Sequence, residues 1–344
     1  MKHGEWGYAS QYQFKKHKAP HNKNILRTIR RCLCYLRKIK EAQSVKRYRI
    51  YQVDAFTKSR FEGNPAGVVA NADGLADSQM QAIARELNNS ETAFILSPTS
   101  SDHEVWIRFF TPTMEVPTCG HATISAHFVR ALEMGLASRR IYQRIGIGVL
   151  PVDINKEDSG YRVTMTQGLP EISLPIKGQN QNDILNALGL SVSDIDERCP
   201  IQIASTGSSK VMIGIKTREK LNSLTPDLGS LTNISRTIGS NGYFVFTFDS
   251  DDNDILSHGR MFGPAMGIPE DPVTGNANGP LGAYLVHNNI LKAQNGSLAF
   301  IGKQGEAMGR PGIVMVNVEV KDGKPVKVQV GGHAVVAFKT EIEI

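Results

Sequence analysis

The sequence predicts an α+β protein built from two related halves, each a curved sheet around a central helix. Arg108 to Pro117 (RFFTPTMEVP) can be laid over Arg260 to Pro269 (RMFGPAMGIP) at an offset of 152, with Arg, Phe, Pro, Met and the final Pro in step. Ile83 to Phe94 lies over Ile234 to Val245 at an offset of 151, and both stretches run from a helical into a strand pattern. Self-similarity at a period near half the chain indicates an internal duplication. Strands dominate each copy, which has one long helix, so we expect two α+β halves.

The first half is expected to mix strands with helical runs. Arg49 to Phe56 alternates apolar and polar residues, which is typical of a strand. Gly63 to Gly67 has the composition of a turn, after which a strand resumes at Val68, and Asp77 is a suitable cap for a helix with one apolar face. The other expected elements are a turn that enters a strand over 90–96, a strand at 105–110, a helix at 122–134, and strands near 140–145, 148–154 and 161–167.

The second half repeats this order. We expect strands at 201–205, 211–215, 243–248 and 260–262, helices at 228–238 and 277–287, and closing strands at 297–301, 312–321, 325–330 and 334–339. The acidic stretch 249–254 has the composition of a solvated loop. The halves are therefore placed at 47–165 and 166–332, and the terminal strand 333–344 is expected to return to the first half.

Charge is distributed unevenly along the chain. Residues 1–49 carry 14 Lys and Arg against 2 Asp and Glu, a balance of +12, although the whole chain has a net charge of +6. The rest of the chain is therefore mildly acidic, which argues against nucleic acid as a partner. The basic leader, residues 1–46, has two interpretations: a membrane-surface helix or import sequence, or a solvated appendage outside the domain. The second is favoured because basic tails are usually solvated.

Motif searches exclude several kinds of site. Two of the four cysteines lie in the leader, and Cys119 and Cys199 are far apart, so a reducing compartment, the cytoplasm, is expected. No apolar run reaches about 18 residues, so we expect no membrane span in the body. His121 and His127 are six apart on one expected helix and point away from each other, which argues against a metal site. No GxGxxG or GxxxxGKS occurs, so no nucleotide cofactor is expected.

Two stretches predict helix N-termini that bind an anion. Gly120-His121 and Gly275-Asn276 each open a helical run, and they correspond in the overlay after a slip of three residues. The first N–H groups of a helix have no partner within it, and the helix dipole favours negative charge there, so either entrance can bind a carboxylate or a phosphate. Two halves that face each other would place both entrances in one cleft.

Three side chains near these entrances are candidates for proton chemistry. Glu91 begins a strand, and its counterpart in the overlay is Gly242, so only one half carries this carboxylate. Partial burial in a cleft would raise its pKa toward neutrality, as suits a general base that later acts as an acid. His121 lies in the first turn of a helix, whose positive end favours neutral imidazole. Asp271 is placed to orient a substrate or relay a proton. On residue type alone, a capping or surface role remains open for each.

Cys119 bears on a different reaction. A thiol at a helix N-terminus can have a lowered pKa. A two-base racemase would need a second thiol opposite, and the facing position is Thr274. A buried, inert thiol is therefore the favoured interpretation of Cys119.

Four motifs in the same order resemble the phenazine-biosynthesis PhzF-like proteins. The likeness extends from about residue 47 to the C-terminus and leaves the leader outside. The motifs are Gly63-Asn64-Pro65-Ala66-Gly67-Val68, Ser90-Glu91-Thr92, Pro117-Thr118-Cys119-Gly120-His121-Ala122-Thr123 and Glu270-Asp271-Pro272-Val273-Thr274-Gly275. This resemblance implies a diaminopimelate-epimerase-like fold, with two pseudo-symmetric halves and the active site in the cleft between them.

The same resemblance implies roles for named residues. Glu91 matches the family's acid/base, and His121 and Asp271 match residues that position the substrate. Backbone N–H groups after Gly120 and Gly275 would bind the substrate carboxylate. The chain departs from the phenazine enzyme at Asn276, where that enzyme has Ser, and an amide cannot shuttle a proton as a hydroxyl does. The resemblance also implies a homodimer.

We therefore expect a cofactor-independent isomerase that moves a proton on carbon in a small carboxylate substrate. Glu91, His121 and Asp271 are the expected catalytic residues, and Gly120, Gly275 and Asn276 are expected to bind the substrate. One alternative is an epimerase or racemase of the same fold, which the missing second thiol disfavours. Another is a non-catalytic ligand-binding or interaction protein.

Overall fold

The structure, a computed structural model, describes residue 31 and residues 45–344. The interpretation of residues 1–46 therefore falls almost entirely outside the described residues. Residues 47–342 form one compact unit.

Strands and helices of the first half follow the expected order. They are β1 (Arg47–Ala55), β2 (Asn64–Val69), α2 (Asp77–Leu87), β3 (Thr92–Leu96), β4 (Val105–Phe110), β5 (Glu115–Val116), α3 (Gly120–Met134), β6 (Arg139–Ile145), β7 (Gly148–Glu157) and β8 (Gly160–Thr166).

The second half contains the same series with additional helices. Its elements are β9 (Glu171–Ile172), α4 (Gln179–Leu188), β10 (Gln202–Ser205), β11 (Lys210–Ile215), α5 (Arg218–Asn222), α6 (Leu228–Ile238), β12 (Tyr243–Thr247), β13 (Ser257–Gly263), β14 (Ile268–Asp271), α7 (Gly275–His287), β15 (Ser297–Gln304), β16 (Gly312–Lys321) and β17 (Lys324–Glu343), with short 3-10 turns at Val192–Asp194, Pro264–Met266 and Glu306–Met308.

The strand pairing confirms the internal duplication. In the first half β2 pairs antiparallel with β1 and parallel with β3, and β4 pairs antiparallel with β3 and β5 and parallel with β6. In the second half β11 pairs antiparallel with β10 and parallel with β12, and β13 pairs antiparallel with β12 and β14 and parallel with β15. The two ladders thus have the same order and the same directions.

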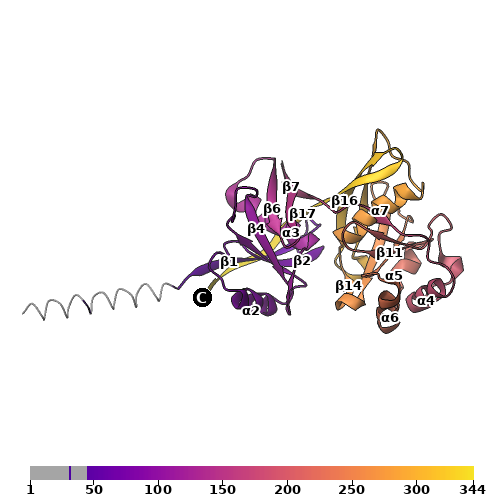
Figure 1. Cartoon of the computed structure of the whole chain (residues 1–344), viewed down its shortest axis with the longest axis horizontal. Coiled ribbons are helices and arrows are strands. Elements are labelled where there is room, and N and C mark those ends of the chain that lie inside the picture. The colour runs from indigo at the N-terminus through magenta and orange to yellow at the C-terminus, as the bar shows by residue number, and fades with distance from the viewer. Residues whose placement is uncertain (1–30, 32–44) are drawn as a thin grey trace, which may run out of the picture. The chain divides into compact units, whose positions relative to one another are not determined.

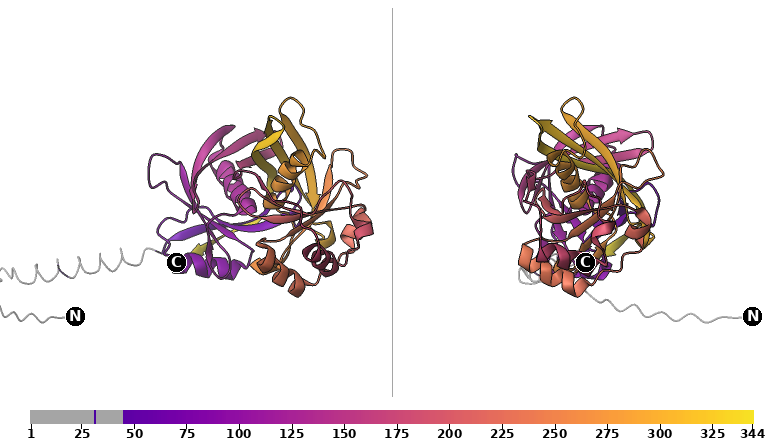
Figure 2. Two further views of the ribbon diagram at one scale, coloured as in Figure 1. Left: turned by 45° about the vertical axis from the view of Figure 1, so that its right-hand side comes forward. Right: turned by 90° about the vertical axis from the view of Figure 1, so that its right-hand side faces the viewer.

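Each half has a buried helix at its centre. The first-half strands surround α3 and the second-half strands surround α7 (Figure 1). Both helices are buried along most of their length and carry small and branched apolar residues on all sides, as expected of a helix enclosed by sheet. On the opposite faces, α2 packs on β1 to β4, and α4 and α6 pack on β11 to β13. The two central helices contact each other, and Figure 2 shows them from two further sides.

Strand β17 connects the two groups of strands. It pairs with β16 from residue 324 to 331 and with β8 from residue 329 to 333, and it also pairs with β1. Figure 1 shows its yellow ribbon passing from the second group of strands to the first. Two separate strands were expected here because Gly331 and Gly332 interrupt the apolar pattern. A Cβ at Gly332 would lie 2.6 Å from Phe56 Cδ1, so close packing explains that glycine. The division of the unit at residues 165 and 166 stays a prediction.

Two local expectations are wrong. The helix α2 is capped by Ala76, whose N–H bonds the Gln79 side chain at 2.9 Å, and Asp77 lies inside the helix, where it bonds Arg108. Strand β2 begins at Asn64, so the turn at 63–67 ends with Gly63, the residue with positive φ.

One long helix per half was also too few. Helix α4 was not expected because its first turn, Gln179 to Asn182, is polar and gives no amphipathic period. Its apolar residues, which pack in the second-half core, come only in the second half of the helix, from Ile184 onward.

Candidate active site

Glu91 lies immediately before β3, at the edge of the first-half sheet. Its carbonyl oxygen accepts a hydrogen bond from the Gly67 N–H at 3.3 Å, which continues the parallel pairing of β2 with β3. Its carboxylate is 15% exposed, so it is largely shielded but still reaches open space. The local strand pairing therefore fixes the backbone of Glu91 and leaves its side chain available for chemistry.

His121 brings three side chains of the first half together. Its Nε2 lies 3.4 Å from Glu91 Oε2 and 3.3 Å from Ser90 Oγ, and its Nδ1 lies 3.5 Å from Cys119 Sγ. The imidazole is buried in the first turn of α3. Glu91 and His121, singled out in the sequence, are therefore in direct contact.

Cys119 is a protonated thiol in this setting. Full burial and the nearby Glu91 carboxylate raise its pKa well above the ordinary value, because both disfavour the thiolate. This agrees with the inert thiol favoured above rather than with a reactive one. One arrangement was not foreseen: ligand atoms of Glu91, Cys119 and His121 all lie within 4.8 Å of one another, and such residue types can hold a soft metal ion. Sequence spacing missed this trio because Glu91 comes from a distant strand.

Asp271 ends β14 and is buried. Asn64 Nδ2 donates to its Oδ1 at 2.7 Å, and the Thr274 hydroxyl donates to its Oδ2. Burial raises the pKa of Asp271, and this is the largest effect on it. The Glu91 charge raises the pKa further, whereas His121 and the two hydrogen-bond donors lower it. The second-half carboxyl group is thus electrostatically coupled to both first-half catalytic candidates.

The two helix entrances are equivalent by pseudo-symmetry. Cys119 is the N-cap of α3, which begins at Gly120, and Thr274 is the N-cap of α7, which begins at Gly275. Both glycines are buried. The first backbone N–H groups of each helix have no acceptor within the helix, so both entrances offer donors to an anion.

Asn276 is held by a residue that the sequence did not single out. Gln167, just after β8, donates from Nε2 to Asn276 Oδ1 at 2.7 Å and to the Gly275 carbonyl at 3.2 Å. The Thr206 hydroxyl in turn donates to Gln167 Oε1 at 2.8 Å. With its oxygen occupied, Asn276 presents its NH₂ group as the remaining donor. Gln167 lies in a connection between the halves, and no local motif marks it.

The asymmetry at Glu91 is imposed by packing. A Cβ built on its counterpart Gly242 would lie 2.7 Å from the Phe262 carbonyl oxygen and 3.3 Å from Lys210 Cδ. No carboxylate can therefore occupy that position in the second half. Asn64 was also missed as a site residue, because it belongs to a quoted motif without an assigned role. Lys210, whose stem lies beside Gly242, is buried, and nothing in the local sequence marks this burial.

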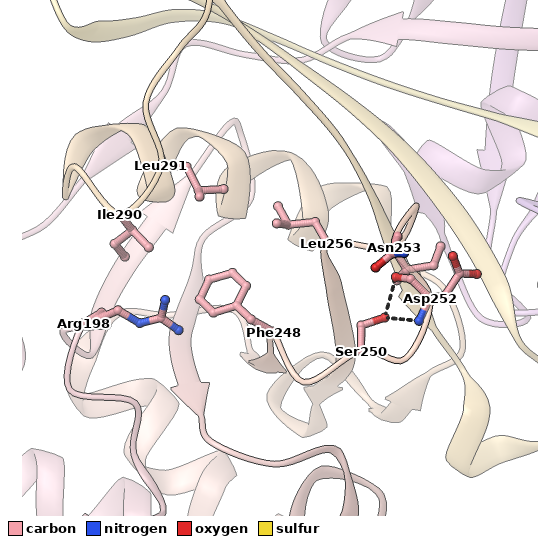
Figure 3. Close-up of a pocket in the computed structure, with 9 residues that line it drawn as sticks. Arg198, Phe248, Ser250, Asp252, Asn253, Leu256, Ile290 and Leu291 are labelled. Carbon is pink, nitrogen blue, oxygen red and sulfur yellow. Dashed lines mark hydrogen bonds between the residues drawn. The ribbon is translucent and has the colours of Figure 1, made fainter.

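Three surface depressions of the described residues lie away from Glu91, His121 and Asp271. The one in Figure 3 has a volume of about 310 Å³ and is formed by the second half. The Arg198 guanidinium lies 5.0 Å from the Phe248 ring centroid and donates to Asp196, and Ser250 bonds the Asp252 backbone. Such an open hollow, whose lining includes none of Glu91, His121 and Asp271, offers no convergent catalytic groups. Among the described helices, none is long and apolar enough to cross a membrane.

Comparison with known proteins agrees with this geometry. Residues 53–340 match the family model described as phenazine biosynthesis-like protein, PhzC-PhzF. An uncharacterised isomerase of Clostridium acetobutylicum is 55% identical over 298 residues, which cover 87% of this chain and 99% of that one. The uncharacterised isomerase YddE of Escherichia coli K12 is 50% identical over 292 residues, covering 85% and 97%. In the sequence, the stretches Ala204 to Met212 and Gly275 to Gly279 also indicate a resemblance to YddE, and this comparison confirms it.

Less similar proteins point to the same family. A trans-2,3-dihydro-3-hydroxyanthranilate isomerase of Pseudomonas fluorescens is 32% identical over 290 residues, which cover 82% of this chain and 95% of that one. The crystal structure of a Bacillus anthracis phenazine biosynthesis protein of the PhzF family superposes with a TM-score of 0.79 at 30% identity, covering 87% of this chain and all of that one. The predicted fold class is confirmed, and the chain belongs to the phenazine biosynthesis-like, or PhzF, family.

Proposed function

We propose that this protein is a cofactor-independent isomerase that moves a proton between two carbon atoms of a small carboxylate substrate. The proposal is carried by the environment of the Glu91 carboxylate. Only 15% of this side chain is exposed, its Oε2 lies 3.4 Å from His121 Nε2, and the second half has no counterpart to it. A single acid/base group without a counterpart in the other half suits removal and return of a proton on the same face of a substrate. The acid–base groups present are sufficient for such a reaction.

The proposed steps use one proton and no external reactant. Glu91 takes a proton from a carbon activated by the substrate's conjugated carboxylate, and the electron pair of that C–H bond moves into the π system. The negative charge that develops is stabilised by the N–H donors at the starts of α3 and α7. The protonated Glu91 then returns the proton to another carbon of the π system, which shifts the double bond.

His121 and Asp271 are assigned to positioning. The His121 imidazole can donate to the Glu91 carboxylate or to the substrate from Nε2, 3.4 Å from Glu91 Oε2. Asp271 is buried, and its two carboxyl oxygens accept hydrogen bonds from Asn64 Nδ2 and from the Thr274 hydroxyl, which fixes the orientation of the carboxyl group for contact with a substrate. Asn276, with its NH₂ group available, adds a fixed donor beside the α7 entrance.

The names of relatives support an isomerase in general and leave the substrate open. YddE is named an uncharacterised isomerase, and the Pseudomonas fluorescens relative is named for a hydroxyanthranilate substrate. Because Asn276 cannot shuttle a proton as a serine hydroxyl can, we propose a substrate whose conversion needs no such relay at this position.

The experiment is proton NMR in D₂O with a panel of small carboxylates, including cyclohexadiene carboxylates and amino acids. Wild-type protein is expected to incorporate deuterium at carbon into a member of the panel, and Glu91→Gln is expected to lose this activity while keeping the fold. Glu86→Gln, the same change on an exposed position of α2, is the matched control. Undiminished incorporation by Glu91→Gln would refute the assignment.

The same samples distinguish the alternatives. An epimerase would invert the configuration at the carbon that exchanges, whereas an isomerase shifts a double bond. The lack of a thiol opposite Cys119, where Thr274 stands, disfavours the epimerase. Saturable binding without exchange on any ligand would instead favour a non-catalytic binding protein.

We also propose that the protein works as a homodimer in the cytoplasm. The reduced state of Cys119 and Cys199, both free and buried, suits a reducing compartment. Sedimentation equilibrium tests the dimer; a monomer at micromolar concentration would contradict it.

A further inference from the structure

The first residue of β11, Lys210, is a buried lysine. Only 2% of its surface is exposed. Lysine is rarely buried to this extent, because removing an ammonium group from water is costly unless the charge is compensated. Its Nζ donates to Ser208 Oγ at 2.8 Å and to the Ser209 carbonyl at 3.2 Å. Both partners are neutral, and since an ammonium has three N–H donors, one of them remains for a ligand.

Pseudo-symmetry relates the Lys210 stem to the Glu91 side chain. Val211 pairs with Tyr243 in the second half as Gly67 pairs with Thr92 in the first. The residue before Tyr243 is Gly242, the counterpart of Glu91. The Lys210 stem lies over Gly242, and Lys210 Cδ is 3.3 Å from the place where a Cβ on Gly242 would be. Where the first half presents a carboxylate, the second half therefore presents an ammonium group that comes from the neighbouring strand.

The surroundings connect Lys210 to the α7 entrance. Residues two apart on a strand share a face, so Lys210 lies on the side of Met212, which packs in one cluster with Ala277 of α7. The loop before β11 is tied to the start of α7 through Thr206 and Gln167, as described above. The Asp271 charge also acts on the Lys210 ammonium.

From this geometry we propose that Lys210 binds a second carboxylate of the substrate, so that the substrate is a dicarboxylate. The proposal rests on the proposed function in one respect, namely that the first carboxylate occupies the helix entrances. A single remaining N–H donor on an ammonium whose two hydrogen-bond partners, Ser208 and Ser209, are both neutral suits one carboxylate oxygen. A phosphate group would call for several converging donors, as in sites built from arginine or backbone nests.

The test compares acids that differ only in the second carboxylate. Succinate, glutarate and adipate are titrated by calorimetry against butyrate, pentanoate and hexanoate, respectively. The proteins are the wild type, Lys210→Met, Lys210→Arg and the surface control Lys324→Met. Wild type and the control are expected to bind at least one diacid about tenfold or more tightly than its matched monoacid, as for one charge-assisted contact. Lys210→Met should lose that preference and bind the monoacids as the wild type does, and Lys210→Arg should retain part of it.

Either of two outcomes would overturn the inference: no diacid preference in the wild type, or an undiminished preference in Lys210→Met. Loss of monoacid binding in a folded Lys210→Met protein would also overturn it, because Lys210 would then act on the first carboxylate or on the site as a whole. Glu91→Gln separates the two proposals. If that variant keeps both the diacid preference and deuterium exchange, the proposed function fails while the Lys210 site stands.

Discussion

Replacing Lys210 by Met should make the protein more stable at neutral pH and less stable at high pH. Burial lowers the pKa of the ammonium from 10.5 to about 8, and the Asp271 charge opposes this only in part. One pKa unit corresponds to about 1.4 kcal/mol, so carrying the proton at pH 7 costs the folded state about 3 kcal/mol relative to the unfolded chain. Lys210→Met removes this cost and keeps the buried stem, but it forfeits two hydrogen bonds at about 1 kcal/mol each. The expected net gain at pH 7 is about 1 kcal/mol.

The sign of this effect depends on pH. Between the folded pKa of about 8 and the unfolded value of 10.5, the unfolded chain binds more protons, so the stability of the wild type rises with pH in this range. At pH 10 the cost that the buried Lys210 imposes on the folded state has fallen to about 1 kcal/mol. Because Lys210→Met still loses two hydrogen bonds at about 1 kcal/mol each, it should be about 1 kcal/mol less stable than the wild type.

Urea unfolding at pH 7 and pH 10 measures both differences, with Lys324→Met as an exposed control that should show neither. A stability difference that does not change between the two pH values would refute the account of Lys210 as a buried, charged group.

Two further predictions concern the pairing of charged groups. Arg260 donates two hydrogen bonds to Glu270, at 2.8 Å each. Arg260→Met should destabilise the fold by about 3 kcal/mol, because Glu270 would be left largely buried without its partner. Chemical denaturation measures this difference, and a loss of stability below about 1 kcal/mol would contradict the prediction. Zn²⁺ should inhibit the enzyme by binding Glu91, Cys119 and His121. Inhibition should be stronger at higher pH, because zinc binds the thiolate and the raised pKa of Cys119 keeps the thiol protonated at lower pH. Chelation by EDTA should restore activity, and Cys119→Ser should weaken the inhibition about tenfold. If Zn²⁺ inhibits Cys119→Ser as strongly as the wild type, these three residues are not the zinc site.

The duplication made much of the fold predictable. Strand and helix patterns repeat at nearly constant offsets, so each half supports the assignment of the other, and α6 and β12 could be expected from α2 and β3. Helix α4 has no counterpart in the first half and begins with a polar turn, so neither the repeat nor the periodicity indicated it. The continuous strand β17 was divided because its two glycines resemble a break, whereas their neighbours pack too closely for side chains.

The candidate site was predictable where a local motif carries a reactive side chain. Glu91 and His121 stand in such motifs, and the structure places them in contact. Gln167 and Lys210 were not predictable in this way, since their importance comes from the fold. Gln167 acts through hydrogen bonds to residues 39 and 109 positions away, and Lys210 is notable for its burial, which a sequence with many surface lysines does not reveal.

The rate of deuterium incorporation at carbon, measured by proton NMR on the first carboxylate that the wild type exchanges, tests the central claim most directly. Removing the acid/base should lower this rate in Glu91→Gln by about 10³-fold or more, while Glu86→Gln exchanges at the wild-type rate. Exchange by Glu91→Gln within about tenfold of the wild type would contradict the account, because the proton would then be carried by another group.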